Sequence, residues 1–184
     1  MKYLMAIILC IALACPVLAS EQLAEANAKF TYQHKPIHPG LLEEFESSIA
    51  DSGEPTTISV DIAAKHGNEY FDDDVSVKDG VVFLKKADGS YFCYKWLGKL
   101  NNDLHVLDVG DSGGGSGVFG NLLFVRFSIS EGYYKGDEYK RLLMTVVGTY
   151  GLGDRDDGKV TVLTDRVVIG KSKYREKEVV LKFP

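Results

Sequence analysis

Histidines are the first side chains to consider for metal or acid–base chemistry, and the chain has four of them. His34 and His38 have the i, i+4 spacing with which two ligands on one helix bind zinc. Pro36 and Pro39 disfavour a regular helix there, because proline lacks the backbone N–H and clashes with the preceding turn. His105 lies in an apolar strand pattern, where we expect it to face solvent or to satisfy a local hydrogen bond. The histidines therefore predict no metal site.

Acidic residues form two groups that could be Ca²⁺-binding loops. One group is Glu69 with Asp72, Asp73 and Asp74, and the other is Asp154, Asp156 and Asp157. An EF-hand loop needs a glycine at its sixth position and a closing glutamate. Gly158 comes one place early after Asp154, and no glutamate completes the loop. We interpret both groups as solvated turn carboxylates, with Ca²⁺ binding as the alternative, and we predict no cofactor.

Cysteine chemistry is limited by where the three cysteines stand. Cys10 and Cys15 fall in an apolar N-terminal run, which leaves Cys93 alone in the rest of the chain. A single cysteine cannot form an internal disulfide. Cys93 stands mid-strand between two aromatic residues, a position that favours a small buried hydrophobic residue over a nucleophile.

A glycine-rich stretch contains a serine that deserves comparison with known nucleophiles. The sequence Gly-Asp-Ser-Gly-Gly at 110–114 resembles the segment around the nucleophile of trypsin-like serine proteases. The resemblance implies Ser112 as nucleophile and a general-base histidine earlier in the chain, where Ala63–His66 is superficially similar. His66 and Ser112 are only 46 positions apart, whereas that fold builds a whole barrel between the two. The family pattern fails on this spacing, so we interpret the stretch as a connection between two strands.

The same stretch contains a G-x-G-x-x-G pattern formed by Gly115, Gly117 and Gly120. Such a pattern binds a dinucleotide where it opens a helix, so that phosphate meets the helix N-terminus. Strand-forming residues follow here instead, at 122–127, and a nucleotide site is not predicted. Six glycines between 110 and 120 indicate a loop with a free backbone, and function often lies on such loops. Ser112, Gly115 and Gly117 are therefore candidate ligand-binding residues.

Aromatic residues alternate along one predicted strand. Phe92, Tyr94 and Trp96 project from the same sheet face, because successive strand side chains point to opposite faces. On an exposed face, this row would stack on sugar rings or anchor a protein partner. On an inner face it would form core. We favour the core interpretation and keep the three residues as candidate ligand-binding residues, should the row lie on an exposed face.

The N-terminus predicts a secretory signal peptide at 1–19. Lys2 precedes an apolar run, and Val17 and Ala19 are the small residues expected before a cleavage site. The run is too short for a transmembrane helix, which needs about 20 residues. We therefore expect export to the periplasm or the cell exterior without stable membrane insertion, with a lipoprotein formed at Cys15 as a minor alternative.

Three regions follow from the pattern of elements: the signal at 1–19, a polar segment at 20–37 in which residues 20–29 fray or form a loose helix, and one mainly β domain at 38–184. Leu41, Leu42, Phe45 and Ile49 recur at helical spacing, which predicts one short amphipathic helix at about 39–51. Strand patterns follow at 58–62, 75–77, 81–86, 91–97, 104–109, 122–129, 142–150, 160–163, 166–169 and 178–183. Asp-Gly pairs at 79–80 and 88–89 predict hairpins. The fold class is an antiparallel β-sandwich or a small β-barrel.

Composition restricts the function classes. Removal of residues 1–19 takes away one lysine and no acid, so the formal net charge changes from −5 to −6. This balance argues against nucleic acid or anionic lipid as a partner. We expect a non-enzymatic module that binds a protein, a glycan or a small ligand. The alternative is a hydrolase of envelope or extracellular polymers that uses paired carboxylates as acid and base.

Overall fold

The computed structural model describes residues 19–43, 58–64 and 75–183. The predicted signal peptide up to residue 18, the acidic group at 69–74 and His66 lie outside these ranges. So does the second part of the helix predicted at 39–51, of which residues 39–43 are helical.

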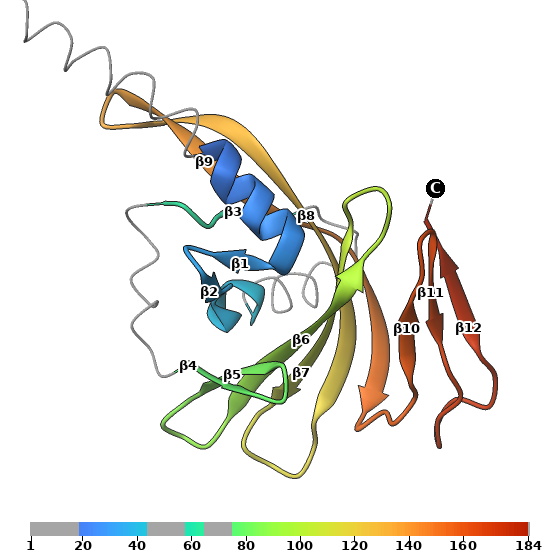
Figure 1. The fold of residues 1–184 in the computed structure, drawn as a ribbon. Coiled ribbons are helices and arrows are strands. Elements are labelled where there is room, and N and C mark those ends of the chain that lie inside the picture. Colours follow the sequence, from blue (N-terminus) through green and yellow to red (C-terminus); the bar gives the residue numbers. More distant parts are fainter. Residues whose placement is uncertain (1–18, 44–57, 65–74, 184) are drawn as a thin grey trace, which may run out of the picture.

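A strongly curved, seven-stranded antiparallel sheet forms the frame of the molecule (Figure 1). Its order is β3-β9-β8-β7-β6-β5-β4, with consecutive strands from β4 to β9 as neighbours. The strands are β3 (Ile58–Asp61), β4 (Val75–Lys78), β5 (Val81–Lys85), β6 (Tyr91–Lys99), β7 (His105–Ser112), β8 (Phe119–Tyr134) and β9 (Asp137–Asp154). The mainly β, antiparallel prediction is confirmed. Closure into a barrel is not found, because β3 and β4 end the sheet without pairing with each other in the described residues.

Two-residue turns fix the register of two hairpins. Asp79 and Gly80 both have positive φ, at 52° and 77°, and join β4 to β5 as the Asp-Gly pair predicted. Lys135 and Gly136 form a similar turn between β8 and β9, with φ of 52° and 91°. The second predicted Asp-Gly turn differs, since Gly89 alone has positive φ within a longer connection between β5 and β6.

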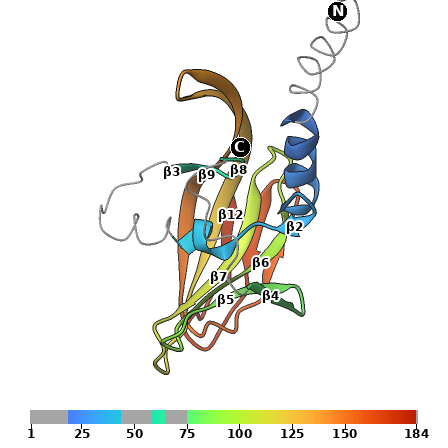
Figure 2. The ribbon, with the colours of Figure 1, turned by 90° about the vertical axis from the view of Figure 1, so that its left-hand side faces the viewer.

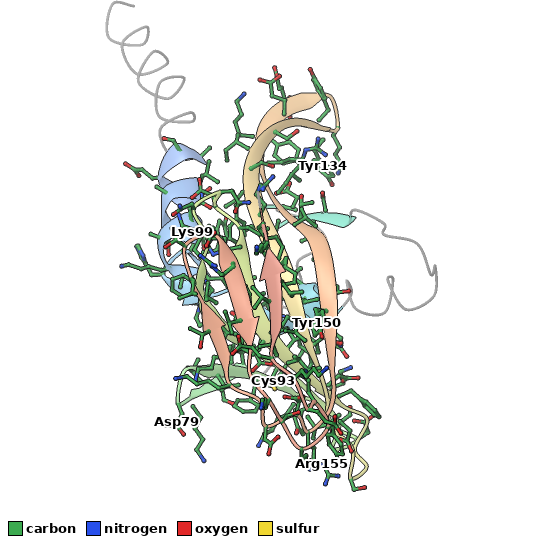
Figure 3. All side chains as sticks on the ribbon, turned by 90° about the vertical axis from the view of Figure 1, so that its right-hand side faces the viewer. Asp79, Cys93, Lys99, Tyr134, Tyr150 and Arg155 are labelled. Atoms are coloured by element: carbon green, nitrogen blue, oxygen red, sulfur yellow. The ribbon has the colours of Figure 1, made fainter. Side chains whose placement is uncertain are left out.

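The β8–β9 hairpin extends beyond the rest of the sheet as an arm (Figures 1 and 2). The strand patterns predicted from the sequence end at 129 and resume at 142, whereas Tyr133, Tyr134 and Tyr139 between them belong to these two long strands. The side chain of Arg141 packs across Gly132, where a Cβ atom would lie 2.7 Å from Arg141 Cδ. Figure 3 places Tyr134 on this arm, far from Arg155 at the other end of the molecule.

A second, three-stranded sheet packs on one face of the large sheet. It contains β10 (Val160–Val162), β11 (Arg166–Ile169) and β12 (Val179–Lys182), all antiparallel. Val167 and Ile169 of β11 meet Val106 of β7 and Phe124 of β8 in one buried cluster. Residues at even positions of β7 and β8 therefore face this small sheet, and the alternate residues face the opposite side.

The N-terminal segment covers the other, inner face of the large sheet (Figure 1). Residues 19–29 are helical, β1 (Thr31–Tyr32) and β2 (Lys35–Pro36) form a hairpin, and residues 39–43 form a short helix. The sequence predicted that residues 20–29 fray or form a loose helix that does not contribute to the domain. Instead, Ala26 and Phe30 are buried in the larger core cluster, because the helix turns its few apolar side chains toward Tyr94 and Phe127.

In the part of the chain that the structure describes, no helix combines the length and the apolar character needed to cross a membrane.

Candidate functional site

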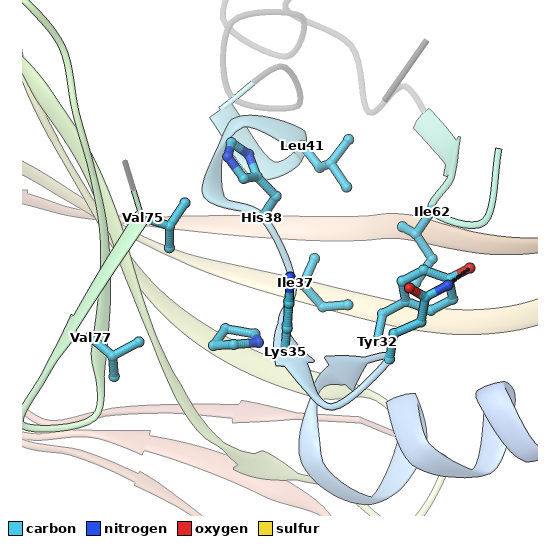
Figure 4. A pocket seen from close by; sticks show the side chains of 10 residues that line it. Tyr32, Lys35, Ile37, His38, Leu41, Ile62, Val75 and Val77 are labelled. Carbon is cyan, nitrogen blue, oxygen red and sulfur yellow. Dashed lines mark hydrogen bonds between the residues drawn. The ribbon is translucent and has the colours of Figure 1, made fainter. Parts of the chain in front are cut away.

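A cavity of about 400 Å³ lies between the β1–β2 hairpin, the short helix at 39–43 and the two edges of the large sheet (Figure 4). Val75 and Val77 of β4 line it from one edge, and Ile62 lines it just after β3 at the other edge. The remaining lining residues come from the N-terminal segment: Tyr32, Gln33, Lys35, Pro36, Ile37, His38 and Leu41. The cavity is thus located where the curved sheet stays open. Its volume is within the range of small-ligand sites, roughly 300–1,000 Å³.

The hairpin that lines the cavity has an unusual backbone. Gln33 and His34 form its two-residue turn with φ of 50° and 62°, a region that non-glycine residues seldom adopt. Glu25 of the N-terminal helix holds this turn, because its Oε1 accepts hydrogen bonds from His34 N (2.7 Å) and from Thr31 Oγ1 (2.8 Å). Although burial opposes ionisation of Glu25, these hydrogen bonds and the nearby His34 lower the pKa of its carboxyl group.

Two contacts attach the cavity wall to the sheet. The hydroxyl of Tyr94 on β6 donates a buried hydrogen bond of 2.6 Å to the carbonyl oxygen of Ile37. Burial raises the pKa of Tyr94, so this hydroxyl remains a donor. Phe30 packs its ring against Tyr94, His105 and Phe127, with centroid distances of 5.4–5.7 Å. The wall is therefore anchored by the interior of the molecule.

His38 caps the short helix and forms part of the wall. Its Nδ1 accepts a hydrogen bond from Gly40 N at 3.1 Å, and its carbonyl oxygen accepts one from Leu41 N, also at 3.1 Å. Pro39 opens the helix, where its missing N–H is not needed. A Cβ atom on Gly40 would lie 3.0 Å from His38 Nδ1, so glycine leaves room for the imidazole cap.

The hairpin end of the cavity carries the hydrogen-bonding side chains of Tyr32, Gln33 and Lys35. Tyr32 accepts a hydrogen bond from Gln33 Nε2 at 3.2 Å, and burial, aided by Asp61, raises the pKa of its hydroxyl. Lys35 is the one Lys, Arg, Asp or Glu among the lining residues in the described part of the chain. The other walls are aliphatic. The cavity therefore suits an apolar group next to an anionic or hydrogen-bond-accepting group.

The predicted aromatic stripe lies in the interior and not in the cavity. Phe92 and Tyr94 are buried in the larger core cluster, and Trp96 packs against it. The core interpretation of Phe92 and Tyr94 is confirmed. The indole Nε1 of Trp96 is buried beside the His105 ring, at a centroid distance of 6.1 Å, without a hydrogen-bond partner among the described residues.

The three candidates on the glycine-rich stretch lie apart from both the stripe and the cavity. Ser112 ends β7 as a buried residue opposite Tyr91, whereas Gly115 is exposed in the connection from β7 to β8. Gly117 is half-buried, close to the ring of Phe119. The structure therefore does not bring the six predicted residues together, and none of them lines the cavity.

His105 is buried, so the prediction that it faces solvent is wrong. Its side chain lies among Phe30, Trp96 and Phe127, and its Nε2 is 3.3 Å from Oδ1 of Asn27 on the N-terminal helix. The sequence missed this contact because it joins segments far apart in the chain. Burial lowers the pKa of His105 to about 4, so the ring is neutral near pH 7.

The sequence interpreted Asp154, Asp156 and Asp157 as solvated turn carboxylates. The structure corrects this, because Asp154 and Asp156 make hydrogen bonds within the fold and the side chain of Asp156 is buried. Asp154 Oδ1 accepts a hydrogen bond from Val118 N at 2.9 Å. The side chain of Asp156 is only 2% exposed and pairs with Arg175 at 2.5 Å, with a further hydrogen bond from Ser172 Oγ. Among the described residues, no group of three or more His, Cys, Asp or Glu is arranged to hold a metal ion.

Cys93 is a free thiol, half-buried on β6. Burial raises the pKa of this thiol, which keeps it protonated and unreactive near pH 7.

Sequence reasoning missed the cavity residues between Tyr32 and Leu41. The turn at Gln33-His34 lacks the Asn-Gly or Asp-Gly signature of a two-residue hairpin. The one available signal was the His-Pro-Gly sequence at 38–40, which combines a polar cap, a proline at the first helical position and a small residue.

Comparisons of the chain with protein-family models, with curated proteins and with solved structures give no match.

Proposed function

We propose that the domain is an exported, non-enzymatic binding module whose ligand enters the cavity between the β1–β2 hairpin and β4. The observation that carries this proposal is the lining: aliphatic walls from Ile37, Ile62 and Val75 meet donors from Tyr32 and Lys35 at one end. Such a lining binds the apolar part of a ligand and orients its anionic or accepting group.

The arrangement favours binding over hydrolysis. A hydrolase of the predicted kind needs two carboxyl groups on either side of the bond that is cleaved. Among the lining residues that the structure describes there is no carboxylate, serine or cysteine. The pKa of Asp108 is raised by burial, but this residue projects from the opposite face of β7, the face that carries the small sheet. The carboxylate mechanism therefore has no support at the cavity.

The test uses the anionic dye anilinonaphthalene sulfonate, which joins an aromatic body to a sulfonate group. We expect one saturable site, measured by dye fluorescence and by isothermal titration calorimetry. Val77 is 59% exposed and lines the cavity, so Val77→Asp changes the site with little effect on the core. This variant should weaken binding about tenfold, because a carboxylate there opposes both the apolar body and the sulfonate.

The matched controls lie outside the cavity. Val180 on β12 is 43% exposed, and Val180→Asp should leave the affinity unchanged. Lys35→Gln should weaken dye binding by a factor of about three, whereas Lys78→Gln should not, because only Lys35 lines the cavity. Equal effects of Val77→Asp and Val180→Asp would show that the dye binds elsewhere and would remove the support for this function.

A further inference from the structure

The edge strand β4 has no described partner strand on one of its two sides. β4 pairs only with β5 in the part of the chain that the structure describes, and its residues Val75 and Val77 line the cavity. Figure 4 shows Val75 and Val77 directed from β4 into the cavity, with His38 and Ile37 across from them. An unpaired edge that borders an apolar cavity is the arrangement that accepts an added strand.

The register of the β4–β5 hairpin determines which backbone groups this edge offers. Lys78 and Val81 flank the two-residue turn, and Ser76 pairs with Phe83 two positions further on. Pairs that exchange hydrogen bonds alternate with pairs that do not, and in a two-residue hairpin the pair flanking the turn exchanges them. The N–H and C=O groups of Val75 and Val77 therefore point away from β5, toward the open edge.

We infer that the ligand of the cavity is an extended peptide segment that pairs with β4 and places an apolar side chain in the cavity. This inference rests on the proposed function and names the ligand class. Val75 and Val77 supply both the backbone pairing and the cavity-facing side chains, so one strand can use both at once.

The charge of the lining adds a preference for the sequence of the peptide. Lys35 is the one Lys, Arg, Asp or Glu of the described lining, and it is in none of the ion pairs found among the described residues. Side chains two residues apart on a strand face the same side. The peptide should therefore carry an apolar residue and, two positions away, an acidic residue that meets Lys35 and the Tyr32 hydroxyl.

The experiment uses the protein from Ser20 to Pro184 and a synthetic probe, acetyl-Thr-Val-Thr-Glu-Thr-amide, followed by amide NMR. Saturable shifts are expected at the N–H groups of Val75 and Val77, together with slower hydrogen exchange of both. A lysine in place of the glutamate in the probe should weaken binding by a factor of about three. Methylation of the probe's backbone nitrogens on one edge, and then on the other, should weaken binding at least about tenfold for the edge that meets β4.

The backbone-methylated probes separate this inference from the proposed function. The protein and its cavity are the same in both titrations, so the dye should bind with unchanged affinity while the probe methylated on the edge that meets β4 does not bind. The inference is overturned if the dye binds and the unmethylated probe does not, or if N-methylated probes bind as well as the parent. Dimerisation through β4, abolished by Val77→Pro, would make a second copy the occupant and would also overturn it. Loss of dye binding to the unmodified protein would instead refute the proposed function itself.

Discussion

At the scale of single residues, His105 couples folding to pH. The ring is neutral and buried, and its pKa is lowered to about 4 from an ordinary value of 6.5, first by desolvation. The unfolded chain therefore binds the proton first as the pH falls. Stability from this group is complete above pH 6.5 and is lost progressively down to about pH 4.

We expect the free energy of unfolding, measured with urea, to fall by about 2 kcal/mol between pH 7 and pH 5 because of His105 alone. The variant His105→Phe keeps the ring contacts with Phe30 and Phe127 but cannot titrate. Subtracting the change in the free energy of unfolding of His105→Phe from that of the parent protein removes the contribution of the other histidines. A variant that loses as much stability as the parent over this interval would contradict the prediction.

A second residue-scale prediction concerns the ion pair between Arg175 and Asp156, whose side chains are 13% and 2% exposed. Arg175→Met leaves a buried carboxylate without its cation, so stability should fall by about 3 kcal/mol. Arg166 pairs with Asp165 at the surface, where the side chains are 43% and 58% exposed. Arg166→Met should therefore change stability by less than about 0.5 kcal/mol, as measured by urea denaturation. Similar losses of stability in Arg175→Met and Arg166→Met would show that burial does not determine how much an ion pair contributes.

At the scale of elements, the N-terminal helix is a structural part of the domain. Ala26 is fully buried against the sheet, whereas Ala28 on the same helix is exposed. Ala26→Leu adds volume where the packing leaves no room and should cost about 1–3 kcal/mol. Ala28→Leu should change stability by less than about 0.5 kcal/mol, since leucine is also a good helix former. Thermal unfolding followed by circular dichroism compares the two, and equal melting temperatures would mean that the helix does not pack on the sheet.

Elements also show which parts of the fold the sequence could predict. Alternation placed Phe92 and Tyr94 on one face correctly, because period-two patterns report directly on sheet faces. The Asp79-Gly80 turn was predictable for the same local reason. The Lys135-Gly136 turn was missed, since a lysine at positive φ is uncommon and gives no signal. The strands β8 and β9 were consequently predicted too short.

The candidate site was less predictable than the fold. The cavity depends on Ile62, Val77 and Pro36 meeting from three separate segments, and no local pattern encodes that meeting. The residues chosen from the sequence, such as Trp96 and Gly115, had suggestive types but occupy the interior and a loop. Side-chain type indicates what a residue can bind, whereas accessibility is decided by the tertiary fold.

At the scale of the whole molecule, removal of residues 1–19 should leave the described core intact. The first described residue that packs against the core is Leu23, four positions after the predicted cleavage site. Expression of the full chain in a secreting bacterial host should yield a product of 165 residues that begins at Ser20, identified by intact mass. Ala19→Tyr, which places a large side chain before the cleavage site, should leave the precursor uncut. A product lipidated at Cys15 would replace this scheme by the lipoprotein alternative.

The attachment of Phe30 to Tyr94 and Phe127 has a consequence for the order of biosynthetic events. These contacts join the beginning of the domain to strands synthesised much later, and such long-range contacts form slowly. A nascent chain cannot bury Phe30 before the ribosome has delivered β8. The segment that carries Phe30 therefore completes the larger core cluster only after most of the domain has been synthesised.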